Sequence, residues 1–145
     1  MSGTDTPRPP NQVVMEWKGA HLFDAGRPGG PMFRMDSDAG PSPVDALLGA
    51  IAGCTATDIV DIMAKRRTPL ASLRANVIGH RADGTPRRLV KVHLEYEVAG
   101  DGIEAAQLQR AVDLSVTKYC SVRDSLDPAI PVTWSITLNG SLLAE

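Results

Sequence analysis

Two cysteines, Cys54 and Cys120, are the residues of this 145-residue chain with the most distinctive chemistry. Cys54 lies inside a long segment of helical periodicity, and Cys120 lies where a second such segment ends and a new turn begins. Two thiols can cycle through an intramolecular disulfide if one is a low-pKa thiolate and the other lies within reach. Two buried structural cysteines, which behave as small hydrophobic side chains, are the alternative. Spacing alone leaves both interpretations open.

A reactive cysteine needs a group that stabilises its thiolate. Cys120 begins a short helical turn with Arg123 three residues on, so the positive end of the helix dipole favours a thiolate there. Cys54 lies mid-helix, where the dipole has little effect, so a cation from elsewhere would have to activate it. The candidates in the N-terminal third are Lys18, His21, Arg27 and Arg34.

Three acidic residues share the helical segment with Cys54. Asp58 and Asp61 follow at i+4 and i+7, on roughly the same face, and unpaired carboxylates there would raise the pKa of the thiol. The alternative is that both belong to a solvated stripe, because carboxylates are mostly exposed. Asp45 lies three residues after Ser42, which is the spacing of a capping box.

These residues must be positioned by a mixture of strands and helices. Alternating apolar residues predict strands over 13–18, 20–24, 32–35, 72–82, 88–98 and 130–138. Helical spacing predicts helices over 43–67 and 104–119, with a short helical turn over 121–126. The first three strands predict a small antiparallel meander. The fold class is therefore α+β, with antiparallel strands packed around a buried central helix that carries Cys54.

Two glycines, Gly49 and Gly53, interrupt the central helix. Each costs about 1 kcal/mol relative to alanine, which suggests that a strand, another helix or a ligand approaches this face closely. The Pro-rich residues 1–11 predict a disordered tail, which leaves residues 12–145 as a single domain.

Composition excludes several classes of function. Fifteen Lys and Arg against seventeen Asp and Glu, with few aromatic residues, argue against a nucleic-acid partner. No uninterrupted apolar run spans a bilayer and no signal peptide is recognisable, so we expect a cytoplasmic protein with no membrane partner. His21, His80 and His93 are scattered without metal-ligand spacing, so no metal is expected. The basic residues 65–67, 74, 81, 87 and 88 are explained more simply by a helix end and exposed strand faces than by phosphate binding.

Two segments together resemble the OsmC/Ohr family of thiol peroxidases that act on organic hydroperoxides. The first is Gly40-Pro-Ser-Pro-Val-Asp-Ala-Leu-Leu-Gly-Ala-Ile-Ala-Gly-Cys-Thr-Ala-Thr-Asp58, which resembles the family's Cys-bearing helix. The second is Val112-Asp-Leu-Ser-Val-Thr-Lys-Tyr-Cys-Ser-Val122, which resembles its second cysteine segment. The resemblance extends from about Val13 to the C-terminus. It implies an OsmC-like, intertwined homodimer with each cysteine pair near the subunit interface.

The resemblance also implies a reaction. Cys54 would be the peroxidatic thiolate that attacks the O–O bond of a hydroperoxide, leaving a sulfenic acid. Cys120 would resolve it as a Cys54–Cys120 disulfide, and an external dithiol reductant would reset the pair without a metal or flavin cofactor. The apolar helix faces would favour lipid or aryl hydroperoxides over hydrogen peroxide.

The sequence departs from the family at the residues that activate the cysteine. Phe23 stands about where the family's N-terminal arginine is expected, after the matching Trp17-Lys-Gly19. Val44 stands at one acidic position, and Asp45 next to it is the substitute that we assign to the site. The chain therefore resembles a branch with altered activating residues. Hydroperoxide reduction in oxidative-stress defence is the predicted function; the alternative is a non-catalytic or stress-linked OsmC-like dimer that binds a small apolar ligand.

Overall fold

The structure, a computed structural model, describes residues 7–144. The chain divides after Ala46 into two compact units. Of the predicted tail, residues 1–6 lie outside the described residues, whereas residues 7–11 are exposed and form no helix or strand. The extent of the single domain, residues 12–145, stays a prediction.

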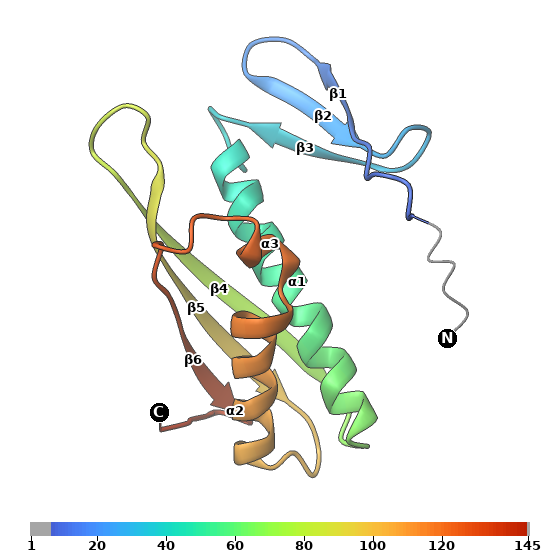
Figure 1. The fold of residues 1–145 in the computed structure, drawn as a ribbon, viewed down its shortest axis with the longest axis vertical. Coiled ribbons are helices and arrows are strands. Elements are labelled where there is room, and N and C mark those ends of the chain that lie inside the picture. Colours follow the sequence, from blue (N-terminus) through green and yellow to red (C-terminus); the bar gives the residue numbers. More distant parts are fainter. Residues whose placement is uncertain (1–6, 145) are drawn as a thin grey trace. The chain divides into compact units, whose positions relative to one another are not determined.

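The first unit contains the antiparallel meander that the sequence predicts. Strands β1 (Val14–Trp17), β2 (Leu22–Gly26) and β3 (Met32–Asp36) pair in the order β1-β2-β3 (Figure 1). The unit carries exposed apolar side chains, among them Trp17 at 67% and Phe33 at 52%. Its last residues begin the long helix α1 (Pro43–Lys65).

The start of α1 is fixed by the predicted capping box. Ser42 Oγ accepts a hydrogen bond from the Asp45 backbone N–H at 3.1 Å, and Asp45 Oδ2 accepts one from the Ser42 N–H at 2.9 Å. Two backbone donors of the first turn are thereby satisfied. The helix ends at Lys65, two residues before the predicted end.

The second unit contains a four-stranded sheet of order β4-β5-β6-β7. Its strands are β4 (Ser72–Arg81), β5 (Leu89–Ala99), β6 (Val132–Leu138) and β7 (Ser141–Leu142). Strands β4 and β5 are antiparallel as predicted, but β5 and β6 run parallel. The prediction of antiparallel pairing was wrong for this pair because the chain between the two strands crosses back through helices, the type of connection that parallel strands need.

The crossover between β5 and β6 consists of three helical pieces. They are α2 (Ala105–Leu114), a π-helical turn η1 (Ser115–Tyr119) and the short α3 (Ser121–Asp124). The sequence predicts one continuous helix up to Tyr119, whereas the α-helix ends at Leu114. In this stretch Ser115 Oγ donates to the Ala111 carbonyl at 2.7 Å and Thr117 Oγ1 to the Asp113 carbonyl at 2.6 Å. Hydroxyl bonds of this kind to carbonyls four residues back bend helices.

The core of the second unit lies between its sheet and the helices α1 and α2 (Figure 1). On α1, every fourth residue is fully buried: Ile51, Thr55, Ile59 and Met63. On β5, alternate residues are buried: Val92, Leu94, Tyr96 and Val98. From α2 come Leu108, Ala111 and Val112. The helix that carries Cys54 therefore packs its buried stripe against the sheet, as the sequence predicts.

One buried hydrogen bond joins the central helix to the sheet. Thr55 Oγ1 donates to the Ala52 carbonyl at 3.0 Å, which leaves it free to accept from Tyr96 Oη at 2.6 Å. Burial raises the pKa of the Tyr96 phenol to about 12, so the phenol remains a donor at neutral pH. The bond fixes α1 against β5 at the residue next to Cys54.

Tyr96→Phe is expected to lower the free energy of unfolding by about 1–3 kcal/mol, because the buried Thr55 hydroxyl loses its donor. Urea unfolding followed by circular dichroism measures this change. Tyr119→Phe is the matched control, since Tyr119 is 49% exposed. Equal stability of the two variants would show that the buried bond contributes nothing.

Within the described residues, α1 is long and apolar enough to cross a membrane by length and composition. The expectation that no segment is long and apolar enough to span a bilayer was wrong for this helix by length and composition. Core helices of soluble proteins meet the same criterion. The fully buried stripe of α1 against β5 is what a core helix requires.

Candidate active site

The two cysteines meet where α1 passes the start of α3. Cys54 Sγ lies 3.7 Å from Ser121 Oγ, a contact between residues 67 positions apart. Each thiol also affects the pKa of the other, which places Cys120 beside Cys54. Cys54 is half-buried and Cys120 is buried, and both are free thiols. The structure therefore brings together the pair that the sequence singles out.

The environment of Cys54 favours its thiolate. Burial alone would raise the pKa of this thiol, but the Val122 N–H, the Cys120 thiol and the hydroxyl and N–H of Ser121 together lower it. The backbone donors are available because Cys120, with φ −74° and ψ 104°, is the extended N-cap of α3. The first N–H groups of a helix have no partner within the helix, so they can bind a negative sulfur.

Cys120 differs from the sequence-based expectation. Its Sγ accepts the Arg123 N–H at 3.3 Å, as the start of α3 predicts. Burial and, to a smaller extent, the neighbouring Cys54 nevertheless raise the pKa of this thiol to about 11. The donors of the short helix therefore act on Cys120 as predicted, but burial outweighs them and the net pKa shift is upward. Cys54 receives the other free donors of that helix, although the sequence places it mid-helix in α1.

Arg123 does not act as a free cation beside the thiols. Its guanidinium donates to the carbonyls of Asp127, Pro128 and Ile130 at 3.2, 3.3 and 2.9 Å. These bonds hold the loop between α3 and β6. The role of Arg123 is therefore to fix the segment that presents donors to Cys54.

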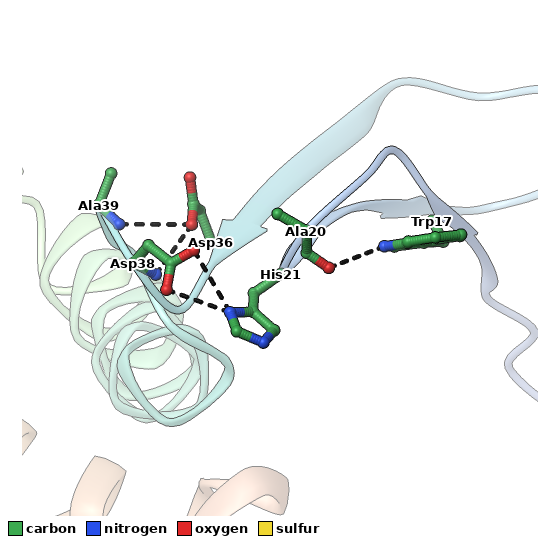
Figure 2. Close-up of polar contacts among 6 residues, drawn as sticks. All are labelled: Trp17, Ala20, His21, Asp36, Asp38 and Ala39. Carbon is green, nitrogen blue, oxygen red and sulfur yellow. Dashed lines mark hydrogen bonds and ion pairs between the residues drawn. The ribbon is translucent and has the colours of Figure 1, made fainter.

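Three of the four candidate cations of the meander have carboxylate partners within their own unit. Lys18 pairs with Glu16 at 2.9 Å, and Arg34 makes two hydrogen bonds to Asp24 at 2.8 and 3.1 Å. His21 Nδ1 lies 3.1 Å from Asp38 Oδ1 (Figure 2). Figure 2 also shows Asp36 Oδ1 accepting the Asp38 and Ala39 N–H groups, and Trp17 Nε1 donating to the Ala20 carbonyl. Arg27 is exposed.

The three acidic residues of α1 differ in their exposure and in their contacts. Asp45 is exposed, and its carboxylate caps the helix, so its catalytic role stays a prediction. Burial and the nearby Asp61 raise the pKa of the half-buried Asp58. Asp61 is exposed, as a solvated stripe requires.

In the part of the chain that the structure describes, no group of three or more His, Cys, Asp or Glu could hold a metal ion.

Ser121 and the Val122 N–H are the site groups that the sequence analysis missed. These groups could have been found from the local sequence. A helical turn that begins at Cys120 and Ser121 predicts an N-cap there, followed by N–H groups that have no partner within the helix. What the sequence does not contain is the tertiary contact that brings Cys54 to those donors.

The second unit has two hollows, of which the smaller adjoins the site. The smaller, of about 400 Å³, is lined by Cys120 together with residues of η1, α3 and the loop that follows. The larger, of about 630 Å³, lies between α2 and the β6 and β7 strands. Its walls are mainly apolar, with Trp134 and Ile136 from β6 and Leu142 and Leu143 near the C-terminus.

Comparison with known proteins decides the family. The family model described as OsmC-like protein matches residues 36–135. Protein YhfA of Escherichia coli (strain K12) is 33% identical over 127 residues, which cover 86% of this chain and 95% of that protein. The chain belongs to the OsmC-like family. This membership associates the protein with oxidative-stress defence and with a family of soluble proteins.

Solved structures share the fold of this OsmC-like protein. A hypothetical protein from Aquifex aeolicus VF5 has a TM-score of 0.78 at 24% identity, covering 91% of this chain and 99% of that one. The organic hydroperoxide resistance protein OhrB of Bacillus subtilis has a TM-score of 0.59 at 11% identity, covering 88% and 98%. At these identities the similarity shows the fold alone.

The lowered pKa of Cys54 predicts a pH profile. The thiolate is the reactive form, so alkylation of Cys54 by iodoacetamide should accelerate as the pH rises through its pKa and then level off. Ser121→Ala removes one donor, so we expect the profile to shift to higher pH and the rate at neutral pH to fall a few-fold. Rates measured by mass spectrometry over a pH series test this.

Ser125→Ala is the matched control for that shift. Ser125 lies in the same short segment, but its hydroxyl donates to the Ser121 carbonyl at 2.7 Å. The control profile should overlay that of the wild-type protein. A profile for Ser121→Ala that also overlays it would remove the Ser121 hydroxyl from the activation of Cys54.

Proposed function

We propose that this OsmC-like protein reduces organic hydroperoxides through the Cys54/Cys120 pair, in oxidative-stress defence. The observation that supports it is the position of the Cys54 thiol, 3.7 Å from the Ser121 hydroxyl at the start of α3, where the N–H groups of Ser121 and Val122 and the Cys120 thiol also lower its pKa. Uncharged donors thereby supply the stabilisation for which the sequence analysis sought a cation. The protein thus combines a favoured thiolate with a protonated partner thiol beside it.

The proposed reaction has two steps on the protein. The Cys54 thiolate attacks the terminal oxygen of the hydroperoxide, the O–O bond breaks, and the leaving alkoxide takes up a proton to become an alcohol. Cys54 is then a sulfenic acid. Cys120 attacks its sulfur, which forms the Cys54–Cys120 disulfide and releases water. An external dithiol supplies the two electrons that restore both thiols, and no bound cofactor takes part.

The direct test is the intact mass under non-reducing conditions, before and after one equivalent of cumene hydroperoxide, followed by peptide mapping. The proposal expects the loss of two hydrogens and a peptide that links Cys54 to Cys120. Two unmodified thiols after treatment would overturn it. The same experiment with hydrogen peroxide measures the expected preference for organic substrates.

The larger hollow favours a second candidate function, the binding of a small apolar ligand. Its volume of about 630 Å³ and its apolar walls fit a drug-sized molecule. Because Trp134 lines it, anilinonaphthalene sulfonate bound there should accept energy from the indole, and Trp134→Phe should remove that signal. Binding without any oxidation of Cys54 by hydroperoxide would favour this function over the first.

We further propose that the protein is a cytoplasmic homodimer, and the helix glycines provide a test. Within residues 7–144, a Cβ atom built at Gly49 or Gly53 meets nothing within 4 Å, so the predicted close approach is not made by the described chain. A partner subunit would supply it. Sedimentation at micromolar concentration should then show a dimer.

The Gly53→Ala variant tests whether the helix face at Gly53 is open to solvent or packed against a partner subunit. On an open face, alanine should stabilise the helix by about 1 kcal/mol, because it removes the entropic penalty of glycine. Against a partner subunit, we expect the added methyl group to weaken the dimer in sedimentation experiments. A stabilised monomer would contradict the dimer; Gly84→Ala, at an open loop position, is the control.

A further inference from the structure

The hollow of about 400 Å³ is lined by one cysteine of the pair and not by the other. Cys120 lines it, with Thr117 and Lys118 of η1 on one side and Arg123 and Leu126 on the other. Cys54 is absent from its walls, although Cys54 is the more exposed of the two cysteines. The two sulfurs are therefore approached by different routes.

The two routes suit two different steps. A hydroperoxide must reach Cys54, whose thiol is half-buried and favours the thiolate. A reductant must attack one sulfur of the disulfide and expel the other as a thiolate, and the thiol of lower pKa leaves faster. Burial raises the pKa of Cys120 to about 11, whereas that of Cys54 is lowered. Attack on Cys120 thus releases the better leaving group, even though Cys120 is the more buried sulfur.

We propose that the hollow beside Cys120 is the entry site for the thiol reductant, which attacks Cys120 Sγ of the oxidised pair and releases Cys54. This rests on the proposed redox cycle of the pair. The exposed Lys118 lies at the wall of the hollow, and its ammonium can attract an approaching thiolate.

The proposed reduction consists of two thiol–disulfide exchanges. A thiolate of the reductant forms a bond to Cys120 Sγ, the Cys54–Cys120 bond breaks, and Cys54 leaves as a thiolate. The second thiol of the dithiol, after losing its proton, attacks the reductant's own sulfur in the mixed disulfide. Cys120 leaves and takes up that proton, and the dithiol departs as a disulfide, oxidised by two electrons.

The attacked sulfur is identified by trapping the mixed disulfide. The protein is oxidised with diamide, treated briefly with limiting 2-mercaptoethanol, quenched in acid and alkylated with N-ethylmaleimide. Peptide mapping then locates the two labels. The proposal expects mercaptoethanol on Cys120 and maleimide on Cys54, in roughly tenfold excess over the reverse pattern. Mercaptoethanol mainly on Cys54 would overturn it.

A second experiment blocks the hollow. Thr117 is exposed at its wall, so Thr117→Trp should slow the reduction of the diamide-formed disulfide by dithiothreitol by about tenfold or more. Ala106→Trp is the control, because Ala106 is exposed on α2 and lines neither hollow. Equal reduction rates of the two folded variants would show that the reductant enters elsewhere.

The use of diamide keeps this inference separate from the peroxidase proposal. If cumene hydroperoxide leaves both thiols intact while diamide forms the disulfide, the peroxidase proposal fails and the trapping still reports the attacked sulfur. If diamide forms no Cys54–Cys120 disulfide, the pair cannot cycle and both proposals are overturned.

Discussion

Replacement of Cys54 by serine is expected to abolish the turnover of organic hydroperoxide, lowering kcat/KM by several orders of magnitude. The serine hydroxyl stays protonated at neutral pH and cannot form a sulfenic acid, so the first attack is lost. The donors at the start of α3 have no negative atom to stabilise in the variant. Consumption of cumene hydroperoxide with dithiothreitol as reductant, measured by a peroxide assay, gives the rate.

Two controls accompany this variant. Circular dichroism should show an unchanged fold, because Cys54 is half-buried and serine is of similar size. Ser125→Ala, in the adjacent segment, should retain wild-type turnover. Multiple turnover in Cys54→Ser that matches the wild-type rate would place the reaction on another residue and overturn the mechanism.

Most of the fold could be predicted from residue patterns. The alternation in residues 88–98 identified β5, and the Ser42–Asp45 spacing located the start of α1, because both are local signals. The parallel pairing of β5 with β6 depends on the path of the crossover, which no local pattern contains. β7, with only two residues, is too short for any alternation.

The break of the second helix shows a different limit. Leu108, Ala111, Val112 and Val116 keep an apolar face through α2 and η1, so the sequence predicts one continuous helix. A π-helical turn changes hydrogen bonding without a change in polarity pattern. The π-helical turn ends at Tyr119, and the next residue, Cys120, is the N-cap of α3.

Within the site, the sequence identified the two thiols and the short helix that acts on Cys120, but not that the same helix also acts on Cys54. Cys120 is adjacent to α3 along the chain, whereas Cys54 reaches the N–H groups of that helix through the packing of α1. Burial, which depends on the whole fold, then raises the pKa of Cys120. The chemical asymmetry of the pair is therefore a tertiary property.

This asymmetry also explains how the chain can lack an arginine at the position of Phe23. The groups that lower the pKa of Cys54 are N–H donors, a hydroxyl and a thiol, none of which carries a charge. Because fixed dipoles at short range are screened less by salt than exposed charges are, the thiolate should persist at high ionic strength. We therefore expect the alkylation rate of Cys54 at neutral pH to change little with salt.

Cys120→Ser is expected to separate the first attack from the resolving step. The Ser121 hydroxyl and the N–H groups of Ser121 and Val122 remain in the variant, so the Cys54 thiolate should form and attack one equivalent of hydroperoxide at a rate close to that of the wild-type protein. A hydroxyl cannot displace the sulfenic oxygen to form a disulfide. Cys54 should therefore remain as the sulfenic acid and, with excess hydroperoxide, proceed to the sulfinic and sulfonic acids.

Intact mass recorded over time distinguishes this outcome, because the variant should gain one oxygen and then more, while the wild-type protein loses two hydrogens. Trapping with dimedone identifies the sulfenic acid on the Cys54 peptide. Sustained turnover with a dithiol in Cys120→Ser would mean that the reductant attacks the sulfenic acid directly. Cys120 would then be dispensable for resolution, and the hollow beside it would lose its role in the cycle, so this variant tests the mechanism at the step on which both proposals depend.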